Sequence, residues 1–271
     1  MVHLRKVLIF VAVICVVLLL LTLAIGLIDS FKVTVTRYVV DLGGVKELKI
    51  VQLSDLHLKG FSDQEKRVVD IVVNENPDII VLTGDYVEDV NYLKFFKSFI
   101  KYLRSKLNDT EIYAIIGNWE LQAGTEYEVK EILENCGIRL LVNDYVVTEV
   151  KGIKVGIIGL DDYLWGVPNY TLINELPDID LRLLLVHEPS AALRASEEGF
   201  KGLVLTGHCH GGQVKIFGIP LYLPRGCPPE LFEGYHDING TKIIVSRGIG
   251  STFIPVRLWV NPEVVVIEVK V

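Results

Sequence analysis

Cysteine is scarce in this sequence, and its positions form no pattern. The 271 residues include four cysteines. Cys15 lies inside a long apolar segment, whereas Cys136, Cys209 and Cys227 follow at irregular intervals. Three cysteines outside that segment, with no repeating spacing, do not indicate a disulfide framework. We therefore expect small buried or incidental thiols.

Basic residues are in the minority. Lysine and arginine together number 27 against 34 acidic residues, which gives a formal net charge of −7. General nucleic-acid binders usually present a basic surface, so this composition argues against that class. Internal repeats and low-complexity runs are also lacking. The length and the 50% hydrophobic content suit one globular domain.

A long apolar run stands near the N-terminus. Residues 7–28, VLIFVAVICVVLLLLTLAIGLI, carry no charge, and about 20 apolar residues suffice for a helix to cross a membrane. A cleavable signal peptide is the alternative, because Ala24 and Gly26 loosely fit a cleavage site. The apolar region of a signal peptide is usually only about 7 to 15 residues long. We expect a membrane anchor over residues 1–30 and a separate domain over residues 31–271.

The charges beside this run bear on its orientation. Arg5 and Lys6 precede it, whereas Lys32 and Arg37 follow it among acidic residues. Basic residues favour the cytoplasmic side of a span. We expect a single-pass membrane protein with its domain outside the cytoplasm.

The rest of the chain alternates apolar, β-branched runs with helical patterns. Runs at 48–53, 79–83 and 111–116 predict strands, and capping boxes beginning at Ser62 and Thr125 predict helices between them. A hairpin with its turn at Lys151–Gly152 and further short strands follow. Because one sheet cannot comfortably hold so many strands, we expect an α/β fold with a two-sheet β-sandwich flanked by helices.

Polar residues able to bind metal ions cluster directly after the predicted strands. In open α/β sheets, ligands bind beyond the carboxyl ends of the strands, so one pocket could hold the whole set. Their nitrogen and oxygen donors suit Mn, Fe, Zn or a similar divalent ion, and seven donors exceed the needs of one ion. The seven candidates are Asp55, His57, Asp85, Asn118, His187, His208 and His210.

The order of these motifs resembles a known family. "DLH", "GD", "GN", an isolated "H" after a strand and "GHCHGGQ" look like the five blocks of the calcineurin-like metallophosphoesterases. The resemblance covers residues 48–271. Its last part, residues 246–269, is similar to the branch with membrane-associated or exported phosphoesterases, some of which act on lipid-linked diphosphates. The family fold is also a two-sheet sandwich flanked by helices.

The resemblance implies a role for each candidate. It assigns Asp55, His57 and His210 to one divalent metal ion and Asn118, His187 and His208 to a second. Asp85 would bridge the two ions. A metal-bridging hydroxide would be the nucleophile, so no Ser or Cys nucleophile is required.

Trp119 departs from the family pattern. The "GN" block usually continues with a His that assists the leaving group, and an indole N–H cannot exchange a proton near neutral pH. This substitution favours substrates whose leaving group departs without help, such as phosphoanhydrides or aryl esters. Trp119 could stack on a substrate or simply pack across the pocket mouth. His236 could replace the missing acid, although a surface role is the simpler interpretation.

Several other residues receive structural interpretations. We expect Asp161 and Asp162 to be turn residues, Glu120 to hydrogen-bond near the site, and Cys209 to point away from the metals on an extended segment. Residues 216–240, rich in Pro, Gly and aromatics, predict a functional loop. The candidate contacts for an anionic substrate are Arg225, Arg247 and Arg257.

These observations lead to two hypotheses. The first is a membrane-anchored, binuclear metal-dependent phosphoesterase that hydrolyses a phosphodiester or diphosphate, with a substrate that could be lipid-linked. The second is a non-catalytic binding protein that keeps its metals but has lost the acid His at position 119.

Overall fold

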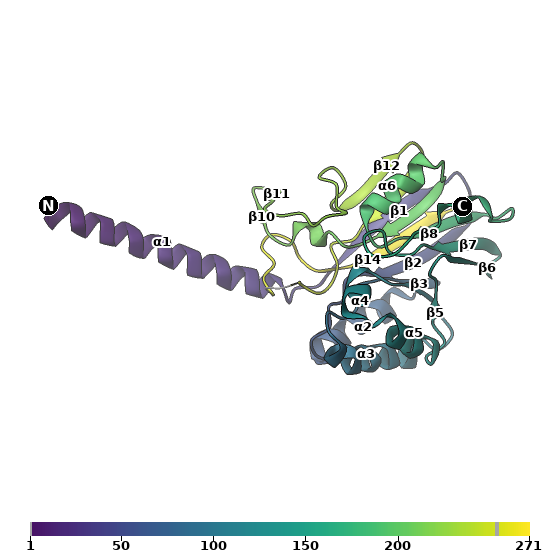
Figure 1. Ribbon diagram of the computed structural model, residues 1–271, viewed down its shortest axis with the longest axis horizontal. Helices are drawn as coiled ribbons and strands as arrows, with labels where there is room; N and C mark the ends of the chain where they lie inside the picture. Colours follow the sequence, from purple (N-terminus) through teal and green to yellow (C-terminus); the bar gives the residue numbers. More distant parts are fainter. Residues whose placement is uncertain (1, 253–254) are drawn as a thin grey trace.

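Two sheets form the centre of the domain, and one long helix projects from it (Figure 1). The computed structural model describes residues 2–252 and 255–271. Residue 1 of the expected anchor and residues 253 and 254 of the family-like stretch lie outside the described residues.

The first sheet is mixed, with a parallel half. From β2 to β5 its strands are parallel, β14 is antiparallel to β2, and β1 is parallel to β14 at the edge. In spatial order its strands are β1 (Thr34–Asp41), β14 (Glu263–Lys270), β2 (Glu47–Leu53), β3 (Ile79–Thr83), β4 (Glu111–Ile115) and β5 (Arg139–Leu140).

The second sheet also has a parallel centre. β13, β9, β8 and β7 are parallel, and antiparallel strands β12 and β6 form its two edges. The predicted hairpin at Lys151–Gly152 joins β6 to β7. In spatial order the strands are β12 (Gly234–Ile238), β13 (Thr241–Val245), β9 (Gly202–Thr206), β8 (Leu181–Leu185), β7 (Ile153–Gly159) and β6 (Asp144–Val150).

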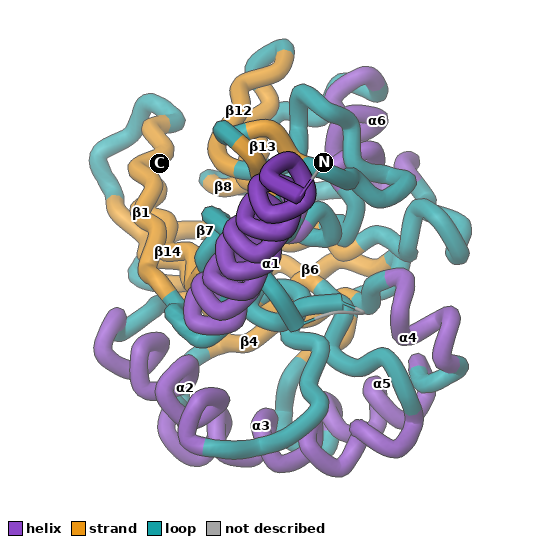
Figure 2. Tube along the Cα trace, turned by 90° about the vertical axis from the view of Figure 1, so that its left-hand side faces the viewer, coloured by secondary structure: helices purple, strands orange, loops and turns teal. Residues whose placement is uncertain are grey.

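The helices cover the outer faces of the sandwich. One apolar core lies between the two sheets, a second under α2, α3 and α5, and a third under α6. Figure 2 shows α6 on the side opposite α2, α3 and α5. The fold expectation is therefore confirmed. The helices are α1 (Val2–Asp29), α2 (Asp63–Glu75), α3 (Leu93–Lys106), α4 (Asn118–Ala123), α5 (Glu126–Glu134) and α6 (Pro189–Glu197), with 3₁₀ turns at Val90–Tyr92, Tyr170–Asn174 and His210–Gly212.

The two predicted capping boxes have different outcomes. At the start of α2, the Ser62 side chain caps the helix and Glu65 accepts the Ser62 backbone N–H at 2.6 Å, as predicted. The second prediction was wrong. Thr125 precedes α5, but its hydroxyl donates to the Glu120 carbonyl instead of capping the helix.

The C-terminal end of α1 is attached to the domain. Among the helices in the described part of the chain, α1 is the one long and apolar enough to cross a membrane. The Arg257 backbone N–H lies 2.8 Å from Ser30 Oγ and 3.2 Å from the Gly26 carbonyl. A side chain at position 26 would lie 2.6 Å from Val256 Cγ1, so glycine permits this close approach.

The expectation for the cysteines was partly wrong. Cys209 and Cys227, 18 residues apart, form a disulfide in the core beneath α6. Cys15 and Cys136 are free. The irregular spacing concealed the pair because the intervening loop returns to the same place in the fold.

A small separate hairpin follows the GHCHGGQ motif. It pairs β10 (Lys215–Ile216) with β11 (Ile219–Pro220). It lies at the end of the domain from which α1 projects (Figure 1).

Candidate metal centre

All seven candidate ligands lie together at the carboxyl ends of strands from both sheets. β2 leads to Asp55 and His57, and β3 leads to Asp85. β4 leads to Asn118, which is the first residue of α4. The sequence patterns did not predict this short helix. In the second sheet, β8 leads to His187 and β9 leads to His208 and His210. All seven side chains are buried.

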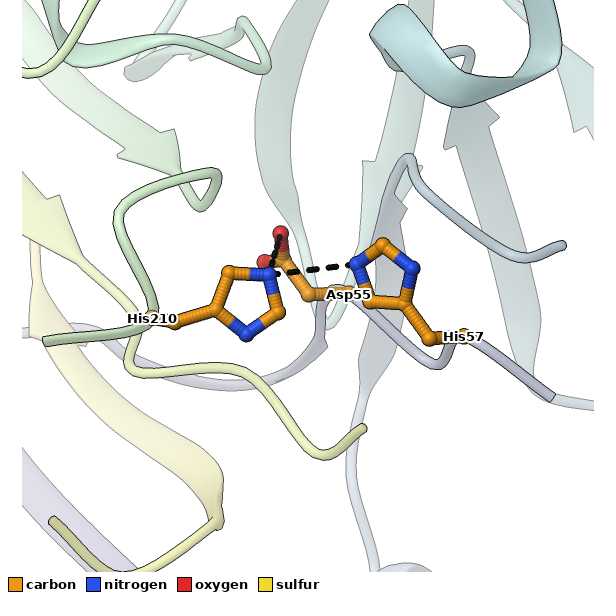
Figure 3. Close-up of side chains that lie close together, drawn as sticks. All are labelled: Asp55, His57 and His210. Atoms are coloured by element: carbon orange, nitrogen blue, oxygen red, sulfur yellow. Dashed lines mark hydrogen bonds and ion pairs between the residues drawn. The ribbon is translucent and has the colours of Figure 1, made fainter. Parts of the chain in front are cut away.

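Asp55, His57 and His210 form the first cluster. Their side chains point toward one another from two different segments (Figure 3). The Nε2 atoms of the two imidazoles are 3.1 Å apart, and His210 Nε2 is 3.4 Å from Asp55 Oδ1. One donor atom from each residue lies within 4.8 Å of the others, which is close enough to hold one metal ion.

Asp85, His187 and His208 form a second cluster, again with donor atoms within 4.8 Å. His187 Nε2 is 3.1 Å from Asp85 Oδ2. Asn118 joins this cluster through its Oδ1, which lies 2.9 Å from His208 Nδ1.

The Asp85 carboxylate lies between the two clusters. Its Oδ2 is 3.1 Å from His187 Nε2 in one cluster and 3.6 Å from His57 Nε2 in the other. Its Oδ1 accepts the Trp119 backbone N–H at 2.9 Å. Trp119 therefore orients this carboxylate through its backbone, whatever its indole does.

Acceptors behind three of the histidines set which ring nitrogen faces the site. His187 Nδ1 lies 2.7 Å from the Thr83 carbonyl, and His208 Nε2 lies 2.8 Å from the Arg225 carbonyl. His57 Nδ1 is 3.1 Å from Glu88 Oε1. Metal-binding histidines usually donate their second N–H to such an acceptor. Sequence reasoning missed Glu88, because it lies in the segment after β3 without a recognisable motif.

His210 has a donor behind it instead. Arg257 Nη2 is 3.1 Å from His210 Nδ1, and a guanidinium can only donate. Nε2 of a neutral His210 therefore carries the proton in this arrangement, and metal binding there requires loss of that proton or rotation of the guanidinium. Burial, followed by the nearby charge of His57, lowers the pKa of His210 well below its usual range.

The pairing around His208 fits a bound cation. Burial and the charge of His187 lower the pKa of His208 to about 4, so its neutral ring carries one N–H. With that proton directed to the Arg225 carbonyl, Nδ1 faces Asn118 Oδ1 lone pair to lone pair. A cation between these two acceptors removes the conflict.

The charge of the buried Asp85 carboxylate also fits a cation. Burial raises the pKa of Asp85, but His187 and His57 outweigh it and lower the pKa to about 2. Burial lowers the pKa of His187, whereas Asp85 and Asp55 raise it well above its usual range. Without a metal, a proton on His187 balances the negative charge. The Nδ1 of His187 is directed to the Thr83 carbonyl, so Nε2 is the ring nitrogen that faces Asp85 at 3.1 Å and is available to an ion.

The backbone of the site is unusual. Left-handed φ angles occur at Asp55 (52°), His57 (41°), Asp85 (56°), His208 (68°) and His210 (50°). Segment 208–210 is therefore a turn, and the expectation of an extended segment was wrong. Cys209 nonetheless points away from the site, into the disulfide with Cys227. Asp and His tolerate left-handed angles better than most residues, and such conformations concentrate at functional sites.

Two glycines of the motifs are required by close packing. A Cβ at Gly117 would lie 2.4 Å from Asp85 Oδ1, and one at Gly207 would lie 2.3 Å from Asp55 Oδ2. Any side chain at these positions would push against a candidate ligand.

Glu120 supports the site through hydrogen bonds, as predicted. Its carboxylate accepts backbone N–H groups of Asp85 at 3.0 Å, Tyr86 at 2.7 Å and Gly117 at 2.8 Å. These hydrogen bonds fix the loops that carry Asp85 and Asn118. Burial and the charge of Asp85 raise the pKa of Glu120 to about 7.

A cavity of about 820 Å³ opens beside the clusters. Asp85, Asn118, His208 and His210 contribute to its floor. The indole of Trp119 also lines it, with its ring edge-on to His57 at a centroid distance of 6.3 Å. Most of the remaining lining is apolar or aromatic: Leu23, Leu164, Trp165, Val214, Leu221, Tyr222, Pro224 and Val256.

The remaining candidates lie in different places. Asp161 and Asp162 accept backbone N–H groups of their own loop, which confirms their structural role. His236 lies on β12, not in an irregular stretch, and its Nε2 is 2.8 Å from the Glu233 carbonyl.

The three arginines proposed as anion contacts also differ. Arg225 lines the cavity. Arg247 pairs with Glu263 at 2.5 Å, and Arg257 is fully buried with its guanidinium bonded to backbone carbonyls. These bonds leave Arg225 as the arginine of the three that faces the cavity.

Comparisons with known proteins agree with this arrangement. The chain is 33% identical over 234 residues to the uncharacterised metallophosphoesterase YkuE of Bacillus subtilis, covering 84% of this chain and 80% of that one. It is 30% identical over 230 residues to the phosphodiesterase YaeI of Escherichia coli, covering 81% of each. The crystal structure of TT1561 from Thermus thermophilus has a similar fold, with a TM-score of 0.52 at 12% identity, covering 75% of this chain and 91% of that one.

A family model gives the most direct assignment. Residues 48–223 match the model of the calcineurin-like phosphoesterases. The matched region begins in β2 and ends beyond the hairpin, so it contains every candidate ligand. This chain belongs to the calcineurin-like phosphoesterase family.

Proposed function

We propose that this protein is a binuclear metal-dependent phosphoesterase that hydrolyses a phosphodiester or diphosphate bond. The observation that carries the proposal is the pair of adjoining donor clusters with the Asp85 carboxylate between them. Asp55, His57 and His210 would hold one ion, and His187, His208 and Asn118 the other. The nitrogen-rich donor set suits Mn, Fe or Zn.

Bound divalent ions would supply Lewis acidity, lowering the pKa of a water molecule for attack at phosphorus and neutralising charge on the phosphoryl oxygens. The chain's own residues orient this chemistry. Asn118 supplies a neutral oxygen donor, Glu120 fixes the neighbouring loops, and Thr83, Arg225 and Glu88 hold the histidine rings.

The residue at position 119 indicates which class of phosphate bond the site hydrolyses. Trp119 occupies the position where an acid would assist the leaving group, so the site favours aryl esters and phosphoanhydrides over alkyl esters. The Escherichia coli relative is named a phosphodiesterase, which supports including phosphodiesters.

We also propose that residues 1–30 anchor the domain, residues 31–271, outside the cytoplasm. α1 has the length and composition of a span. The Cys209–Cys227 disulfide supports this topology, because disulfides persist mainly in oxidising compartments. The apolar cavity lining, including Leu23 of α1, supports an amphiphilic phosphate substrate such as a lipid-linked one.

A turnover assay tests the proposal. The purified full chain, supplied in turn with Mn²⁺, Zn²⁺ and Fe²⁺, is assayed against an aryl phosphodiester, an aryl phosphomonoester and a diphosphate ester. We expect hydrolysis of the phosphodiester or the diphosphate, lost in Asp85→Asn. A chain that binds two ions but hydrolyses none of these compounds would contradict the proposal.

A further inference from the structure

The β10–β11 hairpin exposes an uncharged apolar surface to solvent. Residues 216–222 read IFGIPLY and contain no charged residue. Phe217 at the turn is 94% exposed and Tyr222 is 71% exposed. Ile219 and Leu221 between them are exposed as well. Contiguous apolar surface of this kind usually marks an interaction site.

The turn residue Phe217 is a poor choice for the fold alone. Phe217 and Gly218 form the two-residue loop, with φ angles of 52° and 82°. Loops with two positive φ angles strongly favour Asn-Gly or Asp-Gly. A bulky aromatic in the left-handed region is strained, and an almost fully exposed one gains little from packing. The presence of phenylalanine here therefore points to a partner outside the domain.

Trp259, beside the hairpin, is also an exposed aromatic residue with a left-handed φ angle. It has a φ angle of 58° and is 59% exposed. Its neighbour Leu258 bridges to Val214, and the Leu258 carbonyl accepts the Lys215 N–H at 3.1 Å. Two exposed aromatics in left-handed conformations thus flank one small surface.

This surface adjoins the exit point of α1. Leu23 of α1 lines the same cavity as Leu221 and Tyr222. The segment that carries Trp259 is bonded to the end of α1 through the Arg257 N–H and the Gly26 carbonyl. Figure 1 shows the hairpin at the end of the domain from which α1 projects.

We propose that the β10–β11 hairpin, with Trp259, is a second membrane contact that inserts into the interface of the bilayer that α1 spans. The occupant of this surface is lipid. The segment has no charge with which to select a polar partner, its aromatic residues are of the type enriched at membrane interfaces, and it borders a membrane-spanning helix. The cavity mouth then opens at the membrane surface. This inference rests on the anchor of the proposed function.

Depth-dependent fluorescence quenching tests the inference. The full chain is reconstituted into phosphatidylcholine vesicles with one fluorophore per molecule, after Cys136→Ala removes the free thiol of the domain. The label is placed on native Cys15 in α1, on Ile219→Cys in the hairpin, or on Glu149→Cys, with Cys15→Ala in the last two. Glu149 pairs with Lys154 near the start of β7, at the end of the sheet opposite the site.

We expect nitroxide lipids labelled near the head group to quench the Ile219 probe several-fold more than the Glu149 probe. Aqueous iodide should show the reverse order. Phe217→Asn should reduce the lipid quenching of the Ile219 probe, because asparagine keeps the turn and removes the apolar side chain.

Three results would contradict the inference or part of it, and they differ in meaning. If lipid quenches the Cys15 probe while iodide quenches the Ile219 and Glu149 probes equally, α1 is anchored but the hairpin lies in water. If lipid does not quench the Cys15 probe either, the anchor itself fails. Quenching at Ile219 that is unchanged by Phe217→Asn would refute the role of Phe217.

Discussion

Trp119 contributes to the site through two different groups. Its backbone N–H holds the Asp85 carboxylate, and its indole lies at the cavity beside His57. The backbone contribution is independent of the side chain, so position 119 can vary without loss of the donor clusters. Under the proposed function, the side chain would decide whether a proton donor is available to the leaving group.

The variant Trp119→His should recover acid assistance. General acid catalysis typically contributes about 10² to 10⁴-fold, and the gain should be largest for alkoxide leaving groups. We expect kcat/KM to rise more for an alkyl than for an aryl phosphodiester, with Trp119→Phe as the control. No gain on either ester, with both metals bound, would favour the non-catalytic binding protein.

Gly117→Ala should damage the site without unfolding the chain. The added methyl would lie 2.4 Å from Asp85 Oδ1, so the carboxylate must shift. We expect weaker metal binding and at least about a tenfold fall in turnover, since small misplacements of catalytic groups can lower rates by this much or more. Isothermal titration calorimetry with Mn²⁺ measures the metal binding, and a phosphodiester assay measures the turnover.

Gly60→Ala is the matched control for that variant. A Cβ added at Gly60 would have no atom within 4 Å apart from those of its chain neighbours. Both metal binding and turnover should therefore stay unchanged. Equal effects of the two substitutions would contradict the packing argument.

The sequence was sufficient to identify the seven candidate ligands but not the groups behind them. The candidate ligands follow strands in recognisable motifs. The acceptors for His187 and His208 are backbone carbonyls from β3 and from the loop at Arg225, and no side-chain pattern reveals a carbonyl. The contact of Arg257 with His210 joins segments 47 residues apart. The left-handed angles of the site are likewise a result of tertiary packing.

At the scale of elements, the loop between β9 and β12 connects the fold to the site. The Cys209–Cys227 disulfide closes this loop directly beside His208, and the Arg225 carbonyl in the same loop accepts from the His208 ring. Local patterns predicted an irregular functional loop here. They missed the disulfide, whose cysteines are 18 residues apart, and the small hairpin, whose turn is Phe217–Gly218 instead of a common turn pair. They also missed β12, although it pairs with the next strand across Asn239–Gly240, a recognisable turn signal.

Removing the disulfide should destabilise the domain. Constraining a loop of this size contributes about 3 kcal/mol in the chain-entropy model. We expect Cys209→Ala with Cys227→Ala to lower the free energy of unfolding in urea by about that amount. Cys136→Ala, which removes a free and partly buried thiol, should lower it by less. An equal loss in both variants would argue against the cross-link.

At the scale of the whole molecule, the sequence predicted the layers but not the order of the strands. Periodicity identified many of the strands and the helices α2, α3 and α5, although not α4 or α6, and the number of strands required two sheets. The final strand, β14, lies between β1 and β2, and β1 pairs with it in parallel across more than 200 residues. Hydrophobic patterns carry no information about such distant partners.

The proposed topology predicts the redox state of the cysteines in cells. With the domain outside the cytoplasm, Cys209 and Cys227 should resist alkylation by maleimide added before lysis, unless a reductant is added first. Mass spectrometry of the maleimide-treated chain measures how many cysteines were alkylated. Full alkylation of both without a reductant would place the domain in a reducing compartment.

The central claim is that two divalent ions act together at Asp85, and counting ions in an active preparation tests it most directly. The full chain is loaded with Mn²⁺, freed of excess metal and analysed by non-denaturing mass spectrometry, and the same sample is assayed on an aryl phosphodiester and a diphosphate ester. We expect two ions per chain together with turnover, and in Asp85→Asn the loss of at least one ion and of activity. A chain that binds fewer than two ions while fully active, or two ions without hydrolysing either substrate, would contradict the account.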